Sequence, residues 1–134
     1  MTIYEGAELF RAYLEVSNQL VFGYVSILSG FLIMSYLAAH KLNNWLMALV
    51  LVLFTTVCAI IILQLNFTRD DMGRLYAYLL TLDGADTAWF GKNPAWAPGV
   101  LTSLLNFVTF GGYAGCVAYF FYQRNRGDSD RAQL

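Results

Sequence analysis

Few residues of this 134-residue sequence have side chains suited to catalysis or metal binding. His40 is the only histidine, and Cys58 and Cys116 each lie inside a long apolar run. Neither cysteine has a second sulfur or imidazole at the short spacing that metal sites and redox pairs use. We therefore interpret both cysteines as small packing residues and His40 as a solvated residue at a helix end. The sequence predicts no metal site and no cofactor.

The motifs of common enzyme classes are also missing. The sequence contains no nucleophile elbow, no phosphate-binding loop and no zinc-protease motif. Its net charge of −1 offers no basic footprint for nucleic acid. No ionisable residue lies deep within an apolar run, which disfavours a pump or a proton-coupled transporter. We expect a protein that is not an enzyme and does not bind nucleic acid.

Three long apolar runs dominate the chain. Hydrophobic residues make up 58% of it and charged residues only 13%, against about 25% in an ordinary soluble domain. The runs cover residues 20–39, 45–65 and 99–122, and none of them contains a charged residue. Each is as long as the roughly 20 residues that a transmembrane helix needs. The sequence predicts an all-α integral membrane protein with three transmembrane helices.

Two further helices are predicted beside the spans. Residues 3–18 carry Ile3, Phe10 and Leu14 on one face, which is typical of an amphipathic helix that lies in the membrane interface or continues straight into the first span. Residues 69–82 also have apolar residues at helical spacing and predict a second interfacial helix.

A capping box and a turn are the predicted ends of this second interfacial helix. Thr68 and Asp71 resemble the box, and Asp83 with Gly84 resembles a stop. We interpret residues 1–134 as one helical membrane domain that ends in a short polar tail, residues 124–134.

Small residues form stripes on two of the spans. In the third span these residues are Gly111, Gly115 and Ala118, and in the first they are Gly23, Ser26 and Gly30. Their spacing places each set on one helix face, and small faces let helix backbones approach closely in lipid. We expect the small face of the third span to pack on the first span.

Neutral polar residues form a second set of candidates. They are Gln19, Gln64, Ser103, Asn106 and Tyr113. One interpretation is hydrogen bonding between helices, and the other is the lining of a pore or of a lipid or quinone pocket in an assembly. A third span with one small face and one polar face needs neighbours on two sides. This need predicts a homo-oligomer or docking onto a larger membrane protein.

The connection before the third span is rich in aromatic residues. Trp89, Phe90 and Trp96 flank the sequence Lys92-Asn93-Pro94. Aromatic residues of this kind gather at membrane–water interfaces, and the alternative is a ligand-binding loop.

Basic residues indicate an orientation. One side of the predicted membrane would carry Lys41, Arg124, Arg126 and Arg131, and the other Arg11, Arg69, Arg74 and Lys92. The totals are equal, but the first set lies closer to span ends, which favours the N-terminus outside and the C-terminus inside. We expect an accessory or self-associating membrane subunit in a bacterial inner membrane. The alternative is a homo-oligomeric channel lined by the neutral polar residues of the third or first span.

Overall fold

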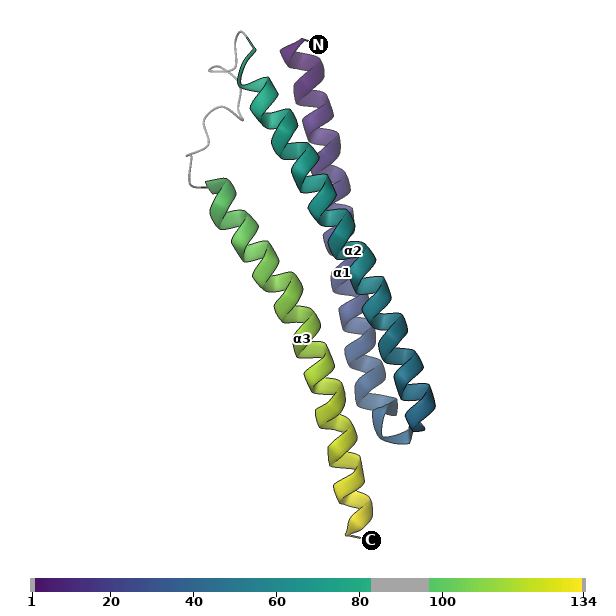
Figure 1. Ribbon diagram of the computed structural model, residues 1–134. Coiled ribbons are helices and arrows are strands. Elements are labelled where there is room, and N and C mark those ends of the chain that lie inside the picture. The colour runs from purple at the N-terminus through teal and green to yellow at the C-terminus, as the bar shows by residue number, and fades with distance from the viewer. Residues whose placement is uncertain (1, 83–96, 134) are drawn as a thin grey trace.

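Three long helices make up the computed structural model, which describes residues 2–82 and 97–133 (Figure 1). They are α1 (Ile3–Ala38), α2 (Asn44–Leu79) and α3 (Ala97–Ala132), and the short 3₁₀ helix η1 (Ala39–Lys41) follows α1. The three are long and apolar enough to cross a membrane, as predicted, and the described residues contain no strand. Each has 36 residues. A helix of that length extends about 54 Å, well beyond a hydrocarbon core of roughly 30 Å.

The helices form a hairpin with a third helix beside it. α1 and α2 run antiparallel and side by side, joined through η1, and α3 continues beyond this turn at the lower end of Figure 1. α3 approaches α1 and η1 from its middle toward its C-terminal end, where Gly112 lies against Leu28 and Gly127 against His40. The two ends of the chain lie at opposite ends of the bundle (Figure 1), as an odd number of spans requires.

α1 joins the predicted amphipathic helix and the first span into one element. It begins with a capping box, in which Thr2 N–H donates to the Glu5 carboxylate at 2.9 Å and Glu5 N–H donates to the Thr2 hydroxyl at 3.3 Å. Accepting the bond from the Thr2 backbone N–H lowers the pKa of the Glu5 carboxyl, and an interaction with the Thr2 side chain lowers it further. The polar residues 17–19 do not interrupt the helix. Residues 3–18 therefore continue straight into the first span.

The separate interfacial helix predicted over residues 69–82 is wrong. These residues continue α2, which runs without a break to Leu79. The reason is visible at Thr68, whose hydroxyl donates to the Gln64 carbonyl one turn earlier at 2.9 Å instead of capping a new helix. A side chain bonded in this way leaves the helical hydrogen bonds intact.

Most of the polar tail is helical. α3 begins at Ala97, with Pro98 in its first turn, and continues through the tail to Ala132. The Arg124 guanidinium donates to the Asn44 side-chain oxygen and approaches the Met47 sulfur, so the start of the tail is held against α2.

Two separate apolar clusters hold the hairpin together. The larger one lies within the apolar runs and includes Tyr24, Phe31, Phe54 and Phe120. Phe31 and Phe54 stack with ring centroids 3.8 Å apart. The smaller one joins residues 3–14 of α1 to residues 72–79 of α2, and to Leu82 just beyond it, around Phe10 and Leu79. We call the paired segments 3–18 and 66–82 the stalk, because they extend beyond the apolar runs.

Candidate functional site

A polar level separates the two clusters. Arg69 of α2, just past the second apolar run, donates from Nη1 to the Asn106 side-chain oxygen of α3 at 3.1 Å. Three other candidate residues, Gln19, Gln64 and Ser103, are exposed. Gln19 precedes the first apolar run directly, and Gln64 is next to last in the second. This level is the physical boundary between the apolar bundle and the stalk.

Deeper polar groups find partners within the chain. The hydroxyls of Thr55 and Tyr113 lie 2.8 Å apart and join α2 to α3. Buried Tyr24 donates its hydroxyl to the Thr109 carbonyl, joining α1 to α3. Other span hydroxyls bond to a carbonyl one turn back in their own helix; these are Ser26, Ser29, Ser35 and Thr56. Such internally bonded groups can face an apolar environment without water.

The small-residue stripes do not pack together within the chain. A Cβ atom placed on Gly23, Gly30, Gly111 or Gly115 would meet nothing within 4 Å. The expected packing of the third span's small face on the first span's stripe is therefore wrong within a single chain. Ser26 and Ala118, the remaining stripe members, are exposed as well.

Other glycines allow the close approaches instead. A Cβ at Gly112 would lie 2.8 Å from the Leu28 side chain, one at Gly6 would collide with Leu79, and one at Gly127 would collide with His40. α3 thus turns Gly112, rather than its neighbour Gly111, toward α1. A packing contact between copies of the chain through the stripes stays a prediction.

The stalk carries a second apolar face on α1. Leu9, Ala12, Tyr13 and Val16 line a shallow hollow of about 160 Å³. They recur at helical spacing on a different side of α1 from Phe10 and Leu14, which pack on α2. Leu9 and Val16 are 44% and 46% exposed. We call these four residues the stalk face.

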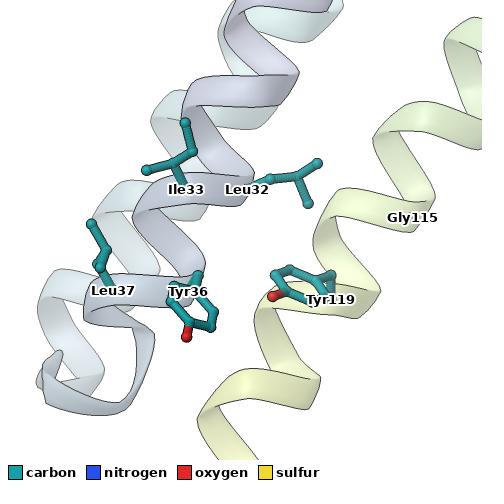
Figure 2. A pocket seen from close by; sticks show the side chains of 6 residues that line it. All are labelled: Leu32, Ile33, Tyr36, Leu37, Gly115 and Tyr119. Atoms are coloured by element: carbon teal, nitrogen blue, oxygen red, sulfur yellow. The ribbon is translucent and has the colours of Figure 1, made fainter.

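A larger hollow lies between α1 and α3, toward the end where the hairpin turns. Figure 2 shows its lining, which is Leu32, Ile33, Tyr36 and Leu37 of α1 with Gly115 and Tyr119 of α3. Gly115 has no side chain to fill the space opposite Leu32, and the rings of Tyr36 and Tyr119 line the hollow from the two helices (Figure 2). The volume is about 610 Å³. We call this hollow the α1–α3 groove.

On both helices an exposed basic residue follows the residues that line the groove. Lys41 follows Leu37 by one turn and is exposed. Arg126 follows Tyr119 by two turns on the same face of α3 and is also exposed. The Tyr119 hydroxyl accepts a hydrogen bond from Gln123 at 2.7 Å. Each wall of the groove therefore carries a tyrosine and is followed along its helix by an exposed cation.

The described part of the chain contains no cluster of metal-ligand side chains. Over residues 2–82 and 97–133 no three histidine, cysteine, aspartate or glutamate side chains lie together as a metal site would need. Cys58 and Cys116 are free and buried. Three of the predicted residues, Trp89, Phe90 and Trp96, lie outside the described residues.

Comparison with known proteins gives no relative. No protein-family model, curated protein or solved structure matches the chain.

Sequence reasoning missed the residues that line the groove and the stalk face. The stalk face could have been predicted from the sequence, because Leu9, Tyr13 and Val16 follow helical spacing on a face that the pairing with α2 leaves open. Leu32 and Tyr36 could not have been predicted in this way, since apolar and aromatic residues occupy every side of the first span.

Proposed function

We propose that the chain is an integral membrane protein that acts as a non-catalytic subunit of a membrane assembly. A second copy of the chain, or a larger membrane protein, covers its stalk face. The apolar residues of this face carry the proposal. Exposed apolar residues within the spans need no protein partner, because lipid tails cover them. The stalk extends beyond the apolar runs, where lipid tails no longer reach.

The geometry of α1 supports this function over a helix lying on the membrane. α1 is continuous from Ile3 to Ala38, so a span that crosses the bilayer carries the stalk out of it. The stalk helices also bury Phe10 and Leu79 against each other, which fixes the stalk face outward. Leu9 and Val16 would then face water, and covering them in an interface is favourable by about 25 cal/mol per Å² of apolar surface.

Site-specific photocrosslinking in membranes tests the proposal. A photoreactive phenylalanine analogue replaces Tyr13 on the stalk face or, as the control, exposed Arg11 on the other side of α1. We expect an adduct from position 13 and not from position 11. An adduct of twice the chain's mass identifies a second copy, and one of another defined mass identifies a larger subunit. Equal adducts at both positions, or none at either, would contradict the proposal.

A homo-oligomeric channel is the second candidate. The observation that favours it is the exposure of Gln19, Gln64 and Ser103, whose polar groups would suit a water-filled path between copies. Two further candidates for a lining are already engaged within the chain, since Asn106 accepts from Arg69 and Tyr113 bonds Thr55. Ion flux through vesicles that contain a verified oligomer separates the two functions, because a subunit without a pore gives no flux.

A further inference from the structure

The α1–α3 groove has the features of a binding site for an anionic phospholipid. Its volume of about 610 Å³ falls in the range of about 300–1,000 Å³ that ligand sites occupy. Four of its six lining residues, Leu32, Ile33, Leu37 and Gly115, offer only apolar surface to an occupant. Both walls come from segments inside the predicted spans, so the space faces lipid tails rather than water. An acyl chain is the occupant that this lining matches.

The missing side chain of Gly115 leaves space for such a chain in the groove. A Cβ there would meet nothing within 4 Å, so the space in front of α3 is open. Leu32 projects from α1 toward this space, and Figure 2 shows Gly115 facing it without a side chain. A larger residue at this position would occupy the groove without colliding with the bundle.

The charges at the groove's end select the headgroup. Lys41 is exposed and lies one turn beyond Leu37 in the sequence. Arg126 is also exposed and lies two turns beyond Tyr119. Arg124 is not available, because it already donates to Asn44. Asp130 lies on the next turn of α3 beyond Arg126, farther from the groove. Basic side chains beside an apolar slot at the membrane surface attract anionic headgroups.

Two tyrosines of the groove suit the interface between lipid tails and headgroups. Tyr36 is 64% exposed, and its ring lines the groove from α1 as that of Tyr119 does from α3 (Figure 2). Aromatic rings with a hydroxyl prefer the interface between lipid tails and water. We propose that the α1–α3 groove binds one anionic phospholipid, with an acyl chain along Leu32 and Gly115 and the phosphate near Lys41 and Arg126.

Native mass spectrometry of the full chain in mild detergent tests this site. The probes are phosphatidylglycerol and phosphatidylcholine with identical acyl chains. We expect the wild-type protein to retain phosphatidylglycerol in preference to phosphatidylcholine. Arg126→Gln lowers the retention of phosphatidylglycerol about fivefold, the effect of one cation near a lipid surface. The matched control is Arg74→Gln, which removes an exposed cation from the stalk and leaves retention unchanged.

A second pair of variants tests the acyl-chain slot. Gly115→Leu fills the groove and abolishes selective retention, whereas Gly23→Leu changes an equally open glycine that does not line it and has no effect. Equal retention of the two lipids by the wild type, or equal behaviour of the two leucine variants, would overturn the proposal. A loss of oligomer mass in Gly115→Leu without a loss of lipid would also overturn it, because a second copy would then occupy the groove. The stalk crosslinks test a different surface, so either proposal can fail alone.

Discussion

At the scale of single residues, glycines with near-identical surroundings in the sequence have opposite roles. Gly111 and Gly112 are adjacent, yet only Gly112 approaches α1, with a Cβ position 2.8 Å from Leu28. A rotation of α3 by one residue would exchange the two roles. The sequence predicts that a glycine face exists but not which glycine meets a neighbour, since Gly111 and Gly112 are adjacent and neither has a side chain that favours one contact over another.

Gly127 gives the sharpest residue-scale prediction. Because a Cβ at this position would collide with the His40 Cβ, close to the η1 backbone, Gly127→Ala must push α3 away from the turn. We expect Gly127→Ala to lower the free energy of unfolding by about 1–3 kcal/mol, as other overpacked substitutions do. Gly73→Ala is the control, because Gly73 lies at an open helical position. This substitution should raise the free energy of unfolding by up to about 1 kcal/mol. The midpoint of denaturant unfolding in detergent reports both effects. Equal midpoints for the two variants would show that α3 does not rest on η1.

At the scale of elements, the spans follow from the sequence but the helix ends do not. The three apolar runs lie inside α1, α2 and α3, because length and hydropathy alone demand a helix there. The break expected before residue 69 is absent. A threonine that precedes acidic residues can cap a new helix or bond one turn back, and Thr68 does the latter. The choice depends on residues 69–79, which gain helical stability by packing on α1.

The same packing predicts that the stalk can be opened without disturbing the spans. Leu79 is fully buried between the stalk helices, so Leu79→Ala removes contacts worth about 2–5 kcal/mol. Neighbouring Leu80 is 45% exposed, and Leu80→Ala should change stability by about 0.5 kcal/mol or less. Hydrogen exchange read by mass spectrometry should rise in residues 3–18 and 69–82 of Leu79→Ala alone. Faster exchange throughout residues 20–39 as well would mean that stalk and spans unfold as one unit.

At the scale of the whole molecule, the bundle is asymmetric along its axis. The hairpin extends past the start of α3 at one end, while α3 extends past the turn at the other (Figure 1). The basic residues Lys41, Arg124 and Arg126 gather at the turn. Anionic lipid is concentrated on the cytoplasmic leaflet, so lipid binding and the positive-inside tendency favour the same orientation. We therefore expect the stalk outside and the C-terminus inside.

Cysteine labelling in intact cells measures this orientation. The native Cys58 and Cys116 are buried and add little background. We expect a membrane-impermeant maleimide to label Glu8→Cys in intact cells and Ser129→Cys only after permeabilisation, because both positions are exposed on their own side. The reverse pattern would place the stalk in the cytoplasm. It would contradict the orientation that we infer from the basic residues and anionic lipid.

The length of α1 has a consequence for any partner. Val16 lies four residues and Leu9 eleven residues before Leu20, where the first apolar run begins. At about 1.5 Å per residue, the stalk face stands between about 6 Å and about 16 Å above the end of the hydrocarbon layer. The paired helices therefore act as a spacer of fixed height. A partner that shares the bilayer must reach up past the headgroups to meet it, so its own matching surface lies in a rigid segment of similar height.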